Sequence, residues 1–160
     1  MTLSIREAEA EHFARLLAGT PPEPGIALPE SGIAPPEVLA MLAELAAEIR
    51  PSFLPAAWMI VDGDRLVGLC SLTRMPADGV LTIGYGIAPS EQGRGAATGA
   101  ITALLEWSAS EPRVTAVAAE TGKSNLASQR VLERNGFAVI GERFDEEDGD
   151  LLCWQWTAPG

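Results

Sequence analysis

Hydrophobic and polar positions change period several times along the chain, and each change marks an expected element. A short strand-like run at the start leads into a helix predicted over about residues 7–18. Residues 19–36 are rich in proline and glycine, so they are expected to form a long loop. The next helix is predicted over residues 37–49, with one apolar face formed by Val38, Met41, Leu42, Leu45 and Ile49.

The middle of the chain alternates between strands and helices. Residues 57–75 predict a hairpin, because two apolar runs are joined by Asp62-Gly63-Asp64. A third strand over residues 79–89 leads into a glycine-rich turn, and a helix with one apolar face follows. Residues 113–120 are apolar at almost every position, which is typical of a central strand covered on both faces.

The last third predicts one more helix and a strand pair. Ser124 or Asn125 can cap the start of that helix, and Gly136 can end it in the left-handed conformation. Two strand runs follow, separated by an acidic turn over residues 145–150. The resulting order is βααβββαβαββ. It predicts an α/β (α+β) fold, a mixed sheet of about seven strands with four helices, in a single domain over residues 1–160.

Charge and hydropathy narrow the function classes. The chain has 22 acidic and 11 basic residues and a formal net charge of −11, which argues against a nucleic-acid partner and is compatible with a cationic substrate such as an amine. The sequence has no apolar run long enough to cross a membrane. Residues 1–20 lack the basic start and apolar run of a secretory signal, so a cytoplasmic location is expected.

Metal and thiol chemistry have little support in the sequence. Cys70 and Cys153 lie far apart without a CxxC spacing and are expected to be buried free thiols. His12 is the single histidine and lies in a surface-helix pattern. We therefore expect no metal site.

Three tryptophans in strand runs are expected in the core: Trp58, Trp154 and Trp156.

Two phosphate-binding motifs match the sequence only in part. A dinucleotide fingerprint would need a third glycine at Thr98, whereas Gly99 comes one residue late, although Glu120 lies near the distance expected for a ribose-binding acid. The segment Thr121–Ser124 resembles the end of a P-loop, but Val117 stands where that motif needs its first glycine. The dinucleotide hypothesis remains a remote alternative, and the P-loop hypothesis is excluded.

A third pattern, Gln-x-x-Gly-x-Ala, is complete. It is formed by Gln92, Gly93, Arg94, Gly95, Ala96 and Ala97. The first turn of a helix has unpaired N–H groups and a partial positive charge, and small residues let a diphosphate approach that backbone closely. Arg94 can add a charged hydrogen bond.

These residues resemble the acetyl-CoA pyrophosphate motif of the GNAT superfamily of N-acetyltransferases. The segment 84–89 is similar to that family's central strand, and residues 125–137 resemble the N-x-x-S…G-F segment of its RimJ/RimL-like branch. One departure is Thr82, where RimL-like chains typically carry an acid. The resemblance implies that strands 81–88 and 113–120 run parallel and splay apart, and that the pantetheine arm of CoA enters the gap.

The resemblance also implies roles for single residues. The backbone near Ile87 would pair with the pantetheine and hold the thioester carbonyl, residues 92–97 would bind the pyrophosphate, and Asn125 would contact the CoA arm. Glu120, at the expected end of its strand, would accept the amine's proton, with a purely solvated role as the alternative. Many relatives protonate the thiolate with a tyrosine from the last third, but Tyr85 is the only tyrosine here. Ser128 matches the serine that RimL-like enzymes place near the sulfur, so the resemblance makes it the candidate donor, with a helix serine that bonds the preceding turn as the alternative.

The predicted function is direct transfer of the acetyl group of acetyl-CoA to a primary amine, either a peptide N-terminus or a small molecule. No covalent intermediate and no metal are expected. The alternative is a non-catalytic acyl-CoA-binding module. The acidic turn could attract a cationic acceptor, and whether two copies pair as a homodimer stays open.

Overall fold

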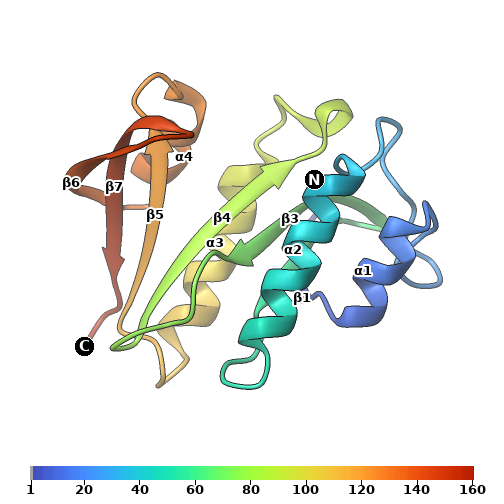
Figure 1. The fold of residues 1–160 in the computed structure, drawn as a ribbon, viewed down its shortest axis with the longest axis horizontal. Helices are drawn as coiled ribbons and strands as arrows, with labels where there is room; N and C mark the ends of the chain where they lie inside the picture. The colour runs from blue at the N-terminus through green and yellow to red at the C-terminus, as the bar shows by residue number, and fades with distance from the viewer. Residues whose placement is uncertain (1) are drawn as a thin grey trace.

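The elements follow the predicted order βααβββαβαββ. A computed structural model describes residues 2–160 (Figure 1). In chain order the elements are β1 (Leu3–Glu7), α1 (Ala10–Leu17), α2 (Pro36–Ile49), β2 (Ala57–Asp62), β3 (Arg65–Leu72), β4 (Val80–Ile87), the 3-10 turn Pro89–Glu91, α3 (Ala96–Ala109), β5 (Ala116–Gly122), α4 (Leu126–Arg134), β6 (Ala138–Asp145) and β7 (Gly149–Thr157).

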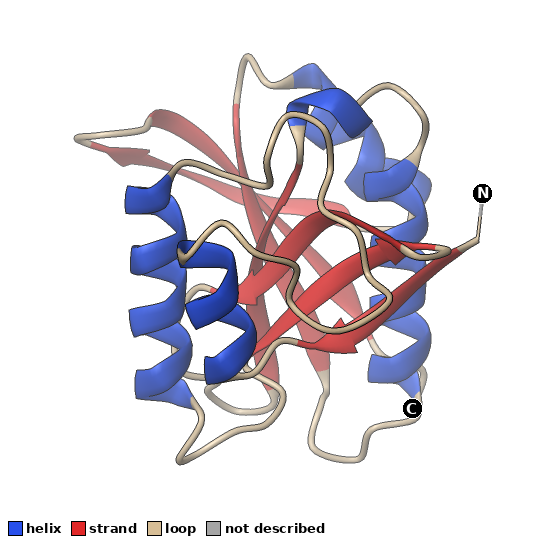
Figure 2. Ribbon diagram, turned by 90° about the vertical axis from the view of Figure 1, so that its right-hand side faces the viewer, coloured by secondary structure: helices blue, strands red, loops and turns tan. Residues whose placement is uncertain are grey.

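The strands form one seven-stranded sheet in the order β1-β2-β3-β4-β5-β7-β6. The β4–β5 pair is parallel and the other pairs are antiparallel, so the prediction of a mixed sheet is confirmed. Helices α1 and α2 cover one face of the sheet, while α3 and α4 lie on the other (Figure 2). The long loop 19–36 is also confirmed, and it is tied to β3 where Leu66 N–H donates to Ala27 O at 2.9 Å.

The two parallel strands separate after a short contact. They are in register from Val80↔Ala116 to Ile83↔Ala119 and not beyond. From there β4 stays paired with β3, and β5 stays paired with β7. Figure 1 shows β4 and β5 diverging toward their C-terminal ends. The expected splay is present, and it divides the sheet into two halves joined along these four pairs.

Two sequence-based predictions are wrong in detail. The buried side of α2 is Leu39, Ala46 and Ile49, whereas Met41 is 56% exposed. The buried face is therefore rotated about the helix axis relative to the predicted one. Val38, Met41 and Leu42, which were predicted to be in the core, line a cavity instead. The central strand, β5, starts at Ala116 and ends at Gly122, later than predicted at both ends. Thr115, just before it, donates its N–H to Gly79 O, just before β4. Glu120 therefore lies within the strand.

The core residues agree with the pattern. Trp58 and Trp154 are buried, and Trp156 packs partly buried against the core. Asn125 is the N-cap of α4, where its side chain accepts from Ser128 N–H, and Gly136 after the helix has a φ of +82°.

Candidate functional site

The gap between β4 and β5 exposes unpaired backbone groups. Ala88 N–H donates to Val67 O at 2.8 Å, so the backbone groups of residue 88 face β3. Consecutive residues of a strand point their N–H groups to opposite sides. The N–H groups of Tyr85 and Ile87 therefore point away from β3, into the gap. This is the edge that a chain-like ligand could pair with.

The gap leads into the glycine-rich turn. Gly93 and Gly95 both have a φ of +79°, which glycine adopts without strain. Gly95 is the N-cap of α3 and offers no side-chain cap, so the first N–H groups of the helix keep their hydrogen-bonding capacity. Gln92 ties the turn to the strand, because its Nε2 donates to Ile87 O at 3.1 Å.

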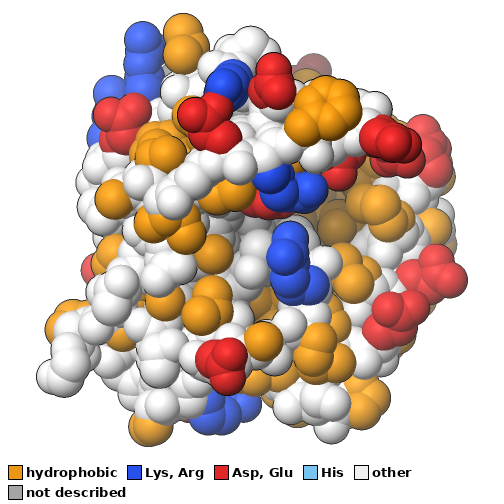
Figure 3. Space-filling model, turned by 60° about the vertical axis from the view of Figure 1, so that its left-hand side comes forward, with side chains coloured by type: hydrophobic (Ala, Val, Ile, Leu, Met, Phe, Trp, Pro, Cys, Tyr) orange, Lys and Arg blue, Asp and Glu red, His pale blue; other side chains and the backbone are white. Residues whose placement is uncertain are grey.

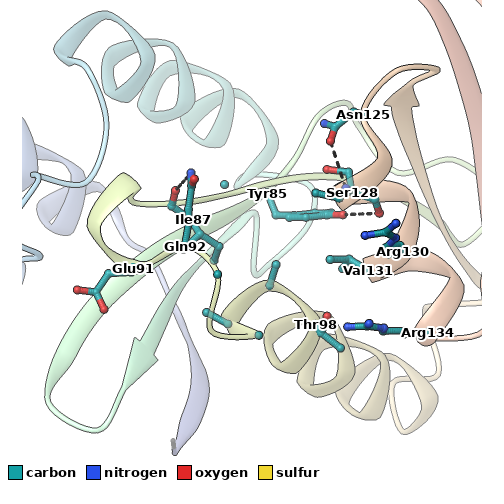
Figure 4. A pocket seen from close by; sticks show the side chains of 16 residues that line it. Tyr85, Ile87, Glu91, Gln92, Thr98, Asn125, Ser128, Arg130, Val131 and Arg134 are labelled. Carbon is teal, nitrogen blue, oxygen red and sulfur yellow. Dashed lines mark hydrogen bonds between the residues drawn. The ribbon is translucent and has the colours of Figure 1, made fainter.

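Helix α4 supplies the facing wall, and the two walls enclose a cavity of about 620 Å³. Figure 4 shows Tyr85, Ile87 and Gln92 on one side and α4 side chains on the other. The lining brings together most of the predicted cofactor-binding residues: Ile87, Gln92, Gly93, Gly95, Ala96, Ala97 and Asn125.

Two basic residues of this wall had not been predicted. Arg130 and Arg134 lie one turn apart on α4 and line the cavity opposite the glycine-rich turn (Figure 4). Neither makes an ion pair within residues 2–160. Their i, i+4 spacing on the helix that carries Asn125 and Ser128 was the available signal. They give the cavity a positive wall, although the chain as a whole is acidic.

Arg94 points elsewhere. Its guanidinium pairs with the buried carboxylate of Glu91, which also contacts Arg65 Nη2 at 3.0 Å. Arg94 is absent from the cavity lining, so in this conformation the turn offers backbone groups rather than the arginine charge.

Tyr85 and Ser128 meet inside the same cavity. The Tyr85 hydroxyl donates to Ser128 O at 3.4 Å, so the phenol spans the space between β4 and α4 (Figure 4). Burial raises the pKa of Tyr85, which keeps its proton in place at neutral pH. The structure thus adds Tyr85 as a second candidate proton donor beside the predicted Ser128.

Glu120 lies on the opposite face of the sheet, in a polar cavity that also contains Arg74, Arg143 and Asp148. Arg143 binds its carboxylate through Nε and through Nη2, the latter at 2.8 Å, and Arg74 Nη2 lies at 3.7 Å. The hydrogen bonds from Arg143 lower the pKa of Glu120, so the carboxylate is ionised at neutral pH. Glu120 and Ser128 line different cavities, but Asn125 lines both.

A third cavity, of about 440 Å³, is mostly apolar. It lies between α2, the end of the 19–36 loop and the sheet, and it shares Tyr85, Gly86 and Ile87 with the cavity beside α4. It shares Thr73 and Gly84 with the polar cavity of Glu120. Figure 3 shows basic side chains beside a hollow with largely apolar walls. The three cavities therefore meet at residues 84–87 of β4.

Several other motifs have structural explanations. A Cβ on Gly99 would lie 2.4 Å from Leu3 Cδ1, so this glycine allows β1 to pack on α3. Lys123 of the P-loop-like segment pairs with Glu142. His12 accepts from Glu9 N–H at the start of α1. Both cysteines are free, but only Cys70 is buried, whereas Cys153 is partly exposed, so the prediction of burial is wrong for Cys153. Burial raises the pKa of the Cys70 thiol to about 12.

Residues 2–160 contain no cluster of side chains suited to a metal ion. In the same part of the chain, every helix is too short or too polar to cross a membrane.

Comparisons with known proteins agree with this geometry. The model of the acetyltransferase (GNAT) domain matches residues 3–138. No curated protein sequence matches the chain.

Among solved structures, one similar fold is RimL, the ribosomal L7/L12 alpha-N-protein acetyltransferase, in complex with coenzyme A. It has 19% identity and a TM-score of 0.73, with 99% of this chain and 95% of that chain covered. A chimera of the spermidine N-acetyltransferase SpeG from Vibrio cholerae and hSSAT has 18% identity and a TM-score of 0.72, with 98% and 96% covered. AAC(6')-Ib in complex with ribostamycin and coenzyme A has 20% identity and a TM-score of 0.70, with 98% and 94% covered.

Proposed function

Because the chain belongs to the GNAT family of acetyl-CoA-dependent N-acetyltransferases, we propose that acetyl-CoA lies in the β4–β5 gap and that a primary amine attacks it from the α2 face. The observation that carries this proposal is the end of the β4–β5 pairing after Ile83↔Ala119. Beyond that point the N–H groups of Tyr85 and Ile87 face a cavity that continues to the glycine-rich turn. The acceptor is an amine of a peptide N-terminus or of a small molecule.

Each part of the coenzyme has a matching surface. The pantetheine arm pairs with the free edge of β4, as an added strand would. The diphosphate lies against the N–H groups at residues 93–97, where the partial positive charge of α3 favours an anion. Arg130 and Arg134 face it from α4, and Arg94 joins them if it leaves Glu91. Asn125 flanks the arm at the start of α4.

The chemistry is a direct transfer. The neutral amine attacks the thioester carbonyl carbon, the C–N bond forms, and the C–S bond breaks. The Ile87 N–H stabilises the oxygen that gains negative charge. The amine's surplus proton passes through water to Glu120, whose carboxylate is ionised at neutral pH. Ser128, in the cavity with the sulfur, gives the departing thiolate its proton, and solvent restores it. An α-amine, with a pKa near 8, loses its proton more readily than a lysine amine near 10.4.

The first experiment measures thiol release and mass shift when the protein is mixed with acetyl-CoA and a panel of amines. Gly93→Ala should weaken CoA binding roughly tenfold or more, because a Cβ would crowd the diphosphate and strain a positive φ. Gly25→Ala is the matched control, since Gly25 has a φ of +85° and lies outside every cavity described above. Equal loss in both variants, or no CoA binding by the unmodified protein, would contradict the proposal. CoA binding without turnover for any amine would instead support an acyl-CoA-binding module.

A further inference from the structure

We propose, on the basis of this function, that the acceptor is a monoamine with a compact apolar group, and that Ser71 binds the polar group next to its amine. The apolar group would occupy the 440 Å³ cavity between α2 and the sheet. The shared chemistry is an amine beside a hydrocarbon side chain. Its source is either a free amine or a peptide that begins with an apolar residue.

The cavity exists partly because two positions of its floor, on β4, are glycines without side chains. Gly84 and Gly86 face α2 from β4, and a Cβ on Gly86 would meet nothing within 4 Å. Val38, Met41 and Leu42 of α2 form the opposite wall. These three residues belong to the apolar face predicted for α2, and the cavity explains why this face is only partly buried. The floor is continuous with the edge of β4 that carries the Ile87 N–H, so a group held here lies beside the thioester site.

The hydroxyl of Ser71 indicates that a ligand in this apolar cavity carries a polar group. It is 4% exposed, and its Oγ has no hydrogen-bond partner within residues 2–160. It lines the cavity opposite α2, in register with Gly84. Buried hydroxyls are normally hydrogen-bonded, because an unpaired one loses its contacts with water and gains none. A ligand amine or carbonyl next to the apolar group would supply the missing partner.

Charge distinguishes this acceptor from a polycation. The lining of the apolar cavity contains no Asp, Glu, Lys or Arg among the described residues. The adjoining polar cavity has two acids, Glu120 and Asp148, and two arginines, Arg74 and Arg143, so its formal charges cancel. A second ammonium group would lie in an apolar space without a counter-charge, which is unfavourable. One amine with one hydrocarbon group fits both cavities.

The test compares kcat/KM for matched amines in the unmodified protein. Leucinamide should exceed glycinamide at least tenfold, since each buried methylene adds to discrimination. Spermidine should fall below both. A peptide that begins with leucine, measured beside leucinamide and phenethylamine, separates the peptide source from the free-amine source. If some amines release thiol but leucinamide shows no advantage over glycinamide, this inference fails while the proposed function stands. If no amine releases thiol, the proposed function itself fails.

Two variants test the residues. Ser71→Ala should lower kcat/KM for leucinamide about fivefold to tenfold through KM, while the KM for acetyl-CoA and the Tm stay the same or the Tm rises. If Ser71 were merely structural, its replacement would lower the Tm instead, and that outcome overturns its role in binding.

Met41→Glu should reduce the preference for leucinamide over glycinamide about tenfold by placing a charge at the cavity wall. Leu17→Glu, at another exposed apolar residue, on α1 and outside every cavity described, should leave the preference unchanged. An unchanged preference in Met41→Glu overturns the assignment of the cavity.

Discussion

At the scale of single residues, the site depends on positions that have no side chain. Gly86 leaves the floor of the apolar cavity open, whereas a Cβ on Gly84 would lie 3.1 Å from Thr73 Cγ2. Gly93 and Gly95 adopt a positive φ in the turn. Gly68 has a different task. A Cβ there would lie 2.4 Å from Gly86 O, so only glycine lets β3 approach β4 beside Ile87.

Gly68→Ala should therefore push β4 toward the gap. We expect a loss of about 1–3 kcal/mol in the free energy of unfolding, as for other overpacked sites, and a higher KM for acetyl-CoA. Chemical denaturation and steady-state kinetics would measure both. Gly141→Ala on β6 is the control, because its Cβ would meet nothing within 4 Å and its φ is not positive. A Gly68→Ala protein with unchanged kinetics would show that this contact does not position Ile87.

Ser128→Ala should lower kcat about tenfold to a hundredfold if the serine protonates the thiolate, with little change in CoA affinity. Pre-steady-state thiol release would report the chemical step. Tyr85→Phe is the companion variant, since the phenol lies 3.4 Å from Ser128 O and keeps its proton. A larger loss in Tyr85→Phe than in Ser128→Ala would transfer the donor role to the tyrosine.

At the scale of elements, α4 brings several functions to one wall. Its N-cap Asn125 holds the first turn, Ser128 follows one turn later, and Arg130 and Arg134 continue along the cavity. The sequence motif indicated the first two. It did not indicate the arginines, because a charge on a helix surface is usually only solvated.

Arg130→Gln and Arg134→Gln should each weaken CoA binding roughly fivefold to tenfold, with most of the effect lost in high salt, where charges are screened. Isothermal titration at two salt concentrations would measure this. Arg113→Gln is the matched control, because Arg113 pairs with Glu111 away from the cavities. If all three variants bind CoA equally well, the α4 arginines do not contact the coenzyme.

The Glu120–Arg143 pair links β5 to β6 across β7, and it predicts a pH dependence of stability. The pKa of Glu120 is lower in the folded protein than its ordinary value of 4.5. The pair therefore stabilises the folded protein fully at a pH above 4.5, and this stabilisation disappears as the pH falls through the folded pKa. The Tm difference between the unmodified protein and Arg143→Gln should therefore be largest near pH 7 and narrow below about pH 4.5. In a Glu120→Gln background, the effect of Arg143→Gln should depend much less on pH, because Asp145, 3.6 Å from Arg143 Nη1, is then the acid that still pairs with the arginine. A Tm difference that is constant with pH would contradict the coupling.

At the scale of the whole molecule, the element order could be predicted from local periodicity, whereas the splay was implied only by the resemblance of two motifs to the GNAT superfamily. Side-chain positions that depend on contacts between distant segments could not be predicted. Arg143 lies 23 residues from Glu120, so nothing in the local pattern indicated that the carboxylate would be held by an arginine. The apolar face of α2 was predicted with the wrong rotation about the helix axis, because periodicity does not distinguish a cavity wall from the core.

In the proposed β4–β5 gap the coenzyme would contact both halves of the sheet, so it should stabilise the whole molecule. At 100 times its Kd, a ligand that binds only the folded state adds about 2.7 kcal/mol, which corresponds to roughly 5–10 °C in Tm for a chain of this size. Thermal melts with and without CoA would measure this. NADH at the same concentration is the control. Stabilisation by NADH without stabilisation by CoA would favour the dinucleotide alternative.

The short contact between β4 and β5 also sets a limit on how stable this protein can become. Its four residue pairs join the two halves of the sheet, and they end where the proposed acetyl-CoA site begins. A change that added further hydrogen-bonded pairs between β4 and β5 would raise the free energy of unfolding but would leave no space for the proposed thioester. Resistance to heat and catalytic competence are therefore opposed at this one place in the fold, and stabilising substitutions are best sought elsewhere.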